Sequence, residues 1–241
     1  MLTIINTPTK GSKMKDINAD QLNHTSIWDL ADWKSCFDPK ASALFIIDPQ
    51  NDILSERGNM SYWGVWKTAE TSMRAIKTTV DFCREHKIPI FWFKYTRPRG
   101  NEAIFPGTIS SIRIIEQRKR VPNIFKNDDW DTEFHDFFLE LIRKEDFIIE
   151  KPSSGCFDGT ILDKVLRQLG TRDLLITGYL TDFCVSNTAR SAYDRGYGAI
   201  VVGDACGTRQ NGFHDEALKH LHWYFSPVIN SSDLESLVFR R

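Results

Sequence analysis

The stretch LLITGYLTDFCVSNTARSAYDRGY, residues 174–197, gives the clearest indication of the fold, and the rest of the sequence follows the same pattern. Its apolar start predicts a buried strand, and VSNTARSAYDRGY predicts a helix that ends at Gly196. A short turn between them carries Cys184. Strand, turn and helix in this order are typical of a parallel α/β sheet, in which ligands bind beyond the carboxyl ends of the strands.

The same alternation runs along most of the chain. Continuous apolar runs, which indicate strands buried on both faces, recur between segments with helical spacing of apolar residues. The predicted strands are ALFIID (43–48), IPIFWFKY (88–95), DFIIEK (146–151), DLLITG (173–178), AIVVGDAC (199–206) and SPVINS (226–231). The predicted helices are AETSMRAIKTTVDFCREHK (69–87), GTILDKVLRQLG (159–170), VSNTARSAYDRGY (185–197) and GFHDEALKHLHWY (212–224). We expect a three-layer, doubly wound, Rossmann-like α/β fold with a mainly parallel sheet of about six strands.

The sequence divides into two parts. Residues 1–40 form a tail and an arm, of which the first 25 or so are polar and irregular. The segment 27–37 contains two tryptophans and is interpreted as a strap or short helix packed on the body, with a dimer contact as the alternative. Residues 41–241 contain every predicted strand and are expected to form one α/β domain.

One segment of that domain breaks the alternation of strands and helices. Residues 97–131 are rich in turn-forming residues and basic in the middle. A connection of this length inside a compact domain is usually functional. We expect a lid or a substrate-selecting insertion, with a surface insertion or an oligomer contact as the alternative.

Composition excludes several classes of protein. The 241 residues are 41% hydrophobic and 26% charged, as in a globular protein large enough to bury its own core. The formal net charge of -1 offers no field that would attract nucleic acid or a membrane surface. The five cysteines form no CxxC pair, which argues against a zinc ribbon or a disulfide framework. The start lacks a signal-peptide pattern and no apolar run has the length of a membrane span, so we expect a cytoplasmic protein.

Three side chains of different chemistry are expected at the ligand-binding edge. Asp48 and Lys151 end two predicted strands, and Cys184 follows a third. Each has an ordinary explanation alone, as a turn cap, a solvated lysine or a small buried thiol. Together they suit covalent catalysis, because a carboxylate can take the thiol proton while an ammonium stabilises the charges. The start of the following helix adds backbone N–H groups of the kind that hold an oxyanion.

At this point the sequence resembles a known family. The segments ALFIIDPQND, EKPSSGCFDGT, ITGYLTDFCVSNTARSAYDRGY and VVGDACGT resemble those of the isochorismatase-like cysteine hydrolases, over about residues 43–228. That superfamily includes nicotinamidases, N-carbamoylsarcosine amidohydrolases, ureidoacrylate amidohydrolases and biuret hydrolases. The resemblance implies that Asp48 is the general base, Lys151 the lysine of the triad and Cys184 a nucleophile that forms a thioester.

The resemblance also implies features of the backbone and the assembly. A non-proline cis peptide is expected between Tyr179 and Leu180. The backbone N–H groups of Leu180 and Cys184 would then form the oxyanion hole. Members of the family commonly form dimers or tetramers, so a homo-oligomer is expected.

Two departures from the family pattern narrow the expected reaction. The nicotinamidase branch has an Asp-x-His metal motif after the second strand, whereas FWFKYTRPRGN (91–101) has neither residue type. Members that hydrolyse the vinyl ether of isochorismate lack the cysteine, and Cys184 is present. We therefore expect an enzyme without metal or cofactor that cleaves a C–N bond of a small linear amide, ureido or carbamoyl compound. A nicotinamidase- or isochorismatase-type reaction remains the alternative hydrolysis.

Other residues are assigned less directly. Candidates for substrate binding are Tyr95, Arg97, Phe157 and Tyr179. Arg99 joins Arg97 as a possible carboxylate ligand. The usual SAF is replaced by SGCF, and we interpret Cys156 as a packing residue. Two other classes of function stay open: a non-catalytic interaction protein of the same fold, and a redox-sensing protein that needs a second thiol near Cys184.

Overall fold

The fold is taken from a computed structural model that describes residues 25–96 and 130–238, with the single positions 109, 112, 116 and 119 between them. The predicted tail before residue 25 lies outside the described residues. So does most of the predicted insertion, 97–131.

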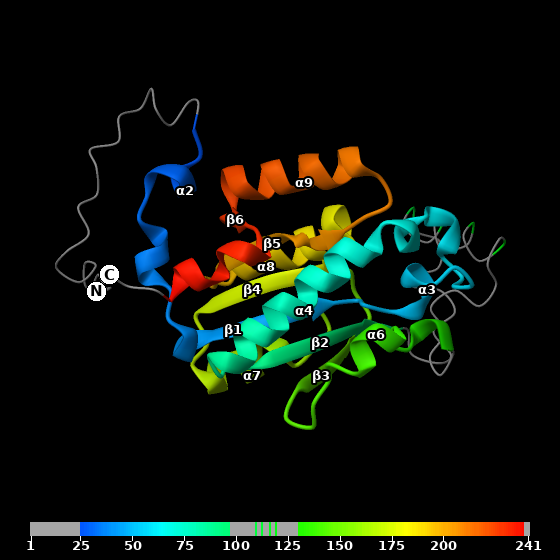
Figure 1. The fold of residues 1–241 in the computed structure, drawn as a ribbon, viewed down its shortest axis with the longest axis horizontal. Coiled ribbons are helices and arrows are strands. Elements are labelled where there is room, and N and C mark those ends of the chain that lie inside the picture. Colours follow the sequence, from blue (N-terminus) through cyan, green and yellow to red (C-terminus); the bar gives the residue numbers. More distant parts are fainter. Residues whose placement is uncertain are drawn as a thin grey trace.

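The centre of the protein is a parallel sheet of six strands in the order β3-β2-β1-β4-β5-β6 (Figure 1). The strands are β1 (Ser42–Ile47), β2 (Ile90–Tyr95), β3 (Phe147–Lys151), β4 (Asp173–Tyr179), β5 (Gly198–Gly207) and β6 (Val228–Ile229). The chain winds outward from β1 to β3 and then returns to continue on the other side with β4. This order makes a doubly wound sheet whose switch point lies between β1 and β4. The predicted fold class is confirmed.

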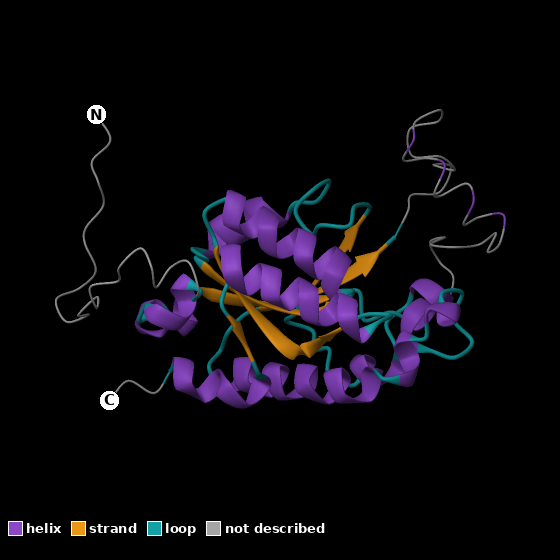
Figure 2. Ribbon diagram, turned by 90° about the horizontal axis from the view of Figure 1, so that it is seen from above, coloured by secondary structure: helices purple, strands orange, loops and turns teal. Residues whose placement is uncertain are grey.

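Helices cover both faces of the sheet (Figure 2). The helices are α2 (Ile27–Leu30), α3 (Asn51–Leu54), α4 (Ala69–Glu85), α6 (Asp136–Leu139), α7 (Leu162–Leu169), α8 (Ser186–Asp194) and α9 (Asn211–Tyr224). Alternate side chains of each strand enter different cores. Leu44 and Ile46 pack with α4 and α6, whereas Phe45 and Ile47 pack with residues of α7, α8 and α9. All six residues of β1 are buried, as its continuous apolar run predicts.

The segment before β1 crosses the outside of this body. After α2, a 3₁₀ turn covers Trp33–Cys36. The Ser26 hydroxyl donates to the carbonyl oxygen of His222 in α9, and the Asp29 carboxylate lies 3.0 Å from the ring Nε2 of the same histidine. The arm is thus tied to α9. Among the described residues, none of the helices combines the length and apolar character needed to cross a membrane.

Two features fix the carboxyl edge of the sheet next to the switch point. Gly178 has a φ of 111°, and a Cβ there would lie 2.2 Å from the carbonyl oxygen of Ile47. Only glycine therefore allows β4 to approach β1 this closely. Gln50 is buried after β1, and its Nε2 donates to the carbonyl oxygens of Tyr95 (3.2 Å) and Thr132 (2.8 Å). The Gln50 side chain thereby joins two chain segments to the edge where β1 ends.

Candidate active site

Asp48 occupies the first residue after β1. Its φ of 51° is unusual for a residue with a side chain, and it turns the chain sharply where the strand ends. The side chain is buried, with Oδ2 lying 2.8 Å from the Nζ of Lys151. The other oxygen, Oδ1, is also buried and accepts no hydrogen bond of normal geometry from the described residues. One carboxylate oxygen is therefore occupied and the other is available.

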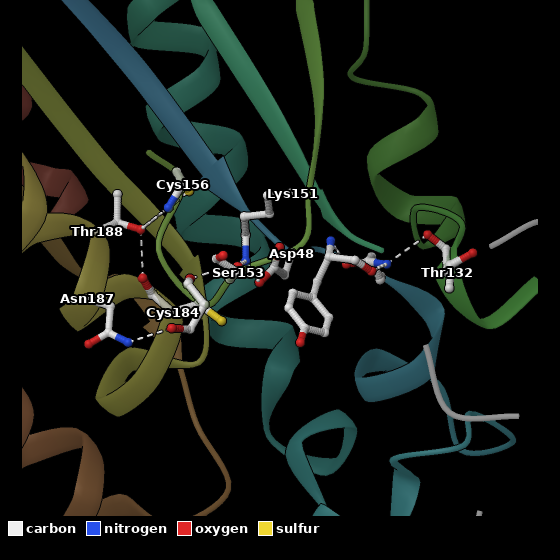
Figure 3. Close-up of polar contacts among 11 residues, drawn as sticks. Asp48, Thr132, Lys151, Ser153, Cys156, Cys184, Asn187 and Thr188 are labelled. Carbon is white, nitrogen blue, oxygen red and sulfur yellow. Dashed lines mark hydrogen bonds and ion pairs between the residues drawn. The ribbon is translucent and has the colours of Figure 1, made fainter. Parts of the chain in front are cut away.

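Lys151, the last residue of β3, is completely buried. Its ammonium has three acceptors: Asp48 Oδ2, the carbonyl oxygen of Ser153 at 3.1 Å and that of Ser154 at 3.2 Å (Figure 3). The ring of Tyr95 lies 4.9 Å from Nζ, measured to the centroid. Since an ammonium carries three hydrogens, this set matches its donors and fixes the charge in place.

Cys184 lies in a π-helical turn, Thr181–Val185, that continues directly into α8. The expected structure was a turn before the helix. The Val185 N–H donates to the carbonyl oxygen of Leu180, five residues back, and this longer ring adds a residue to the first turn. The peptide bond between Tyr179 and Leu180 is cis. Cys184 is only 7% exposed and belongs to the core on the α7–α8–α9 face.

Burial and mutual charge set the proton affinities of these three groups. Burial raises the pKa of Asp48, although Lys151 and the neighbouring Cys184 thiol oppose the shift. Burial also raises the pKa of Cys184 well above its ordinary value, with Lys151 opposing and Asp48 adding to the increase. For Lys151, burial alone would lower the pKa, but the charge of Asp48, with smaller contributions from Cys184 and Cys156, outweighs burial and the pKa is raised. The raised pKa values favour the protonated forms of Lys151 and Cys184, and the ion pair with Lys151 favours the carboxylate form of Asp48.

The structure brings some of the other predicted residues to this site and not others. Tyr95 lies there, against the Lys151 ammonium. Phe157 packs in the core, with its ring stacked 5.8 Å from that of Tyr197. Its role in lining a pocket stays a prediction. Arg97 and Arg99 lie outside the described residues.

Tyr179 needs a different assignment. Its side chain is fully buried in the core on the α4 face, and its hydroxyl lies 2.8 Å from the hydroxyl of Ser72. Cys184 belongs to the core on the opposite face. The phenol is therefore held on the far side of the sheet from the thiol, which argues against the predicted role of Tyr179 in substrate binding.

Several residues of the site were not singled out from the sequence. Gln50 and Asn51 follow β1, and both are buried. The Asn51 Nδ2 donates to the carbonyl oxygen of Trp130 at 3.0 Å, beside the bonds that Gln50 makes. On the other side of the site, Asn187 and Thr188 of α8 bond to the loop after β3. A sequence signal existed only for the first pair, which is polar and comes shortly after a buried strand and Asp48.

Sequence comparison identifies relatives over most of the chain. The family model described as the isochorismatase domain matches residues 42–233. Ureidoacrylate amidohydrolase RutB of Klebsiella pneumoniae (strain 342) is 30% identical over 210 residues, which cover 83% of this chain and 86% of the relative. Nicotinamidase 3 of Arabidopsis thaliana is 22% identical over 195 residues, covering 81% of this chain and 87% of that protein.

Comparison with solved structures gives the same family. A cysteine hydrolase from Pseudomonas syringae pv. phaseolicola 1448A superposes with a TM-score of 0.71 at 19% identity, covering 83% of this chain and 95% of the other. An isochorismatase family protein from Burkholderia thailandensis superposes with a TM-score of 0.65 at 25% identity, covering 84% and 97%. With a matching family model over most of the chain and a relative at 30% identity, the chain belongs to the isochorismatase family of hydrolases.

Proposed function

We propose that the protein hydrolyses a C–N bond of a small linear amide, ureido or carbamoyl compound through a thioester on Cys184. The observation that carries the proposal is the buried cluster of thiol, carboxylate and ammonium, in which Lys151 pairs with one oxygen of Asp48 and the Cys184 thiol lies next to the same carboxyl group. The similarity to ureidoacrylate amidohydrolases supports an amide or ureido substrate. The absence of Asp and His from residues 91–101 supports a reaction without the metal of nicotinamidases.

The first half of the reaction forms the covalent intermediate. As the substrate carbonyl reaches Cys184, the thiol proton passes to Asp48, whose pKa is raised by burial and which is therefore a stronger base than an exposed aspartate. The sulfur attacks the carbonyl carbon. The oxyanion that forms accepts hydrogen bonds from the backbone N–H groups of Leu180 and Cys184. Asp48 returns the proton to the leaving nitrogen, the C–N bond breaks, and ammonia or an amine departs.

The second half releases the product. Water attacks the thioester carbon while Asp48 takes one of its protons, the C–S bond breaks, and the proton returns to the Cys184 sulfur. Lys151 stays protonated throughout, since its three hydrogens are engaged and its pKa is raised. Its contribution is a fixed positive charge that stabilises the carboxylate at rest and the thiolate during attack.

The test is release of ammonia without added metal from a panel of ureido and carbamoyl acids, biuret, nicotinamide and short amides. Cys184→Ala should abolish turnover of whichever compound reacts, and intact mass spectrometry should detect the acyl-enzyme of the unmodified protein. Activity that persists in Cys184→Ala, or that requires an added metal ion, contradicts the proposed mechanism. Turnover of nicotinamide alone would assign the alternative reaction.

The location and assembly of the protein stay predictions. A reducing compartment suits a thiol nucleophile, so we propose that the protein acts in the cytoplasm. We also propose a homo-oligomer without a nucleic-acid or membrane partner. Size-exclusion chromatography with light scattering measures the oligomer directly, and a monomer at micromolar concentration contradicts it.

A further inference from the structure

The loop that follows β3 is attached to the helix that carries Cys184, and we propose that Thr188 is a positioning residue that fixes the thiol relative to Lys151. Thr188 lies one helical turn after Cys184 and is fully buried. Its hydroxyl donates to the carbonyl oxygen of Cys184 at 2.7 Å and accepts from the backbone N–H of Cys156 at 3.2 Å (Figure 3). One hydroxyl thus bonds both to the turn that carries Cys184 and to the loop that follows Lys151.

That loop determines where the Lys151 ammonium lies. The carbonyl oxygens of Ser153 and Ser154 are two of the three acceptors of Nζ. The loop has a second attachment at the neighbouring position of α8, where the Asn187 Nδ2 donates to the Ser154 hydroxyl at 2.7 Å (Figure 3). Consecutive residues of α8 therefore bond to two positions of the loop, Ser154 and Cys156.

The physical consequence is electrostatic. The ammonium favours the thiolate form of Cys184, and this effect decreases with the distance between the two groups. If the loop shifts away from α8, the Lys151 charge moves with it and the thiolate loses stabilisation. Thr188 acts through these two residues and need not touch the substrate. The inference rests on the proposed function only in its effect on turnover, because thiol reactivity is measurable without a substrate.

The neighbouring thiol of Cys156 does not stabilise the Cys184 thiolate as the Lys151 ammonium does. The Cys156 sulfur lies 3.3 Å from the Thr188 hydroxyl, and burial raises the pKa of Cys156 to about 12. Cys156 is therefore neutral at physiological pH and contributes packing and its backbone N–H.

The chain contains a matched control for the hydrogen bond within the helix. Thr79 of α4 is also fully buried and donates its hydroxyl to the carbonyl oxygen of Ala75, four residues earlier, at 2.8 Å. Thr188 makes the same kind of bond, but it adds the bond to the Cys156 loop. Thr79→Val removes the helical bond alone, whereas Thr188→Val removes the helical bond and the link between the two segments.

The experiment measures the rate of Cys184 alkylation by iodoacetamide between pH 6 and 10, with peptide mass mapping to follow this thiol separately. Because burial holds the pKa of Cys184 well above its ordinary value, the rate in this range follows the small thiolate fraction. Thr188→Val should lower that rate about tenfold at pH 7.5, as an increase of one pKa unit implies. Thr188→Ser, which keeps the hydroxyl, should stay within about threefold of the unmodified protein by the same relation. Thr79→Val should leave the profile unchanged.

The outcomes separate positioning from general stability. A folded Thr188→Val protein with the unmodified pH profile overturns the proposal, as does an equal shift in Thr79→Val. Asn187→Ala, which removes only the second attachment, should lower the alkylation rate by a smaller factor. If Thr188→Val does not fold, an unchanged Asn187→Ala profile overturns the proposal. The protein could also show the predicted changes in alkylation rate and yet turn over no compound of the panel. That result would support the positioning role of Thr188 and contradict the proposed function.

Discussion

The ion pair between Asp48 and Lys151 leads to a prediction that separates stability from catalysis. Lys151→Met removes the ammonium and leaves the Asp48 carboxylate buried without its partner. At 2.8 Å the Coulomb attraction is roughly 6 kcal/mol for an effective dielectric constant of about 20, and desolvation of the two groups offsets part of it. We expect the variant to lose about 3–5 kcal/mol of unfolding free energy at pH 7, as when one partner of a buried pair is removed.

This loss should depend on pH with a defined sign. The pKa of Asp48 is already raised by burial, and Lys151 is the main group that lowers it. Without the ammonium the folded state binds a proton more readily than the unfolded state does. The destabilisation is therefore fully present above the folded pKa of Asp48 and shrinks as pH falls toward the ordinary value of 3.8. Urea unfolding at pH 7 and pH 5 measures the difference.

A double-mutant cycle supplies the control. Asp48→Asn leaves Lys151 as the unpaired charge, whereas the double variant with Lys151→Met contains no charge at either position. The unfolding free energy of the double variant should exceed the value expected from adding the two single losses by about 3–5 kcal/mol. None of the three variants should catalyse hydrolysis. Losses that add to within about 0.5 kcal/mol would refute the reasoning, because independent sites behave in that way.

Three further predictions address the base, the sheet edge and the rest of the fold. If Asp48 accepts the thiol proton, kcat/KM should fall in acid with a midpoint above pH 3.8, because burial raises the pKa of this carboxyl group. A pH–rate profile with a midpoint at or below 3.8 would contradict the role of Asp48 as the base. Gly178→Ala should cost at least about 2 kcal/mol in chemical unfolding, because the new Cβ meets a backbone oxygen of β1 at a positive φ, whereas Gly170→Ala, with open space around it, should cost about 1 kcal/mol. Asp146→Asn should cost about 3 kcal/mol at pH 7, since it breaks the nearly buried pair with Arg84. Burial would raise the pKa of Asp146, but its hydrogen bonds, with Arg84 foremost, lower it. The stabilisation by the pair is therefore present above pH 3.8 and is lost as pH falls below this value. Equal losses at pH 7 and pH 3 would count against a stabilising ion pair between Asp146 and Arg84.

Much of the fold follows from the sequence because its signals are local. A continuous apolar run such as ALFIID can only be a buried element, and the carboxyl ends of parallel strands meet at one edge. For that reason the residues ending β1 and β3 and the thiol after β4 were expected close together. The last strand is shorter than expected, Val228–Ile229 where 226–231 was predicted, since Pro227 has no N–H to extend the pairing on its side.

Other features of the site depend on contacts that a local pattern does not contain. The bond from Gln50 to Thr132 joins residues 82 positions apart, and nothing near either residue indicates the partner. The extra residue in the turn at Cys184 also leaves no mark in the spacing of apolar residues. Tyr179 is different, because a signal was present. Strand alternation places it on the same face as Leu175, which packs in the α4-side core, and this rule could have excluded it from substrate binding.

The Gln50 side chain has a consequence for how changes elsewhere in the chain reach the strand ends. Its amide bonds to the residue at the end of β2 and to the segment at 130–132, so the two anchor points of the intervening stretch are joined by one buried group. With the anchors fixed, the entropy of closing a longer or shorter stretch changes only slowly with its length. A change in the length of the chain between these anchors would therefore leave Asp48 and Lys151 in register at the strand ends.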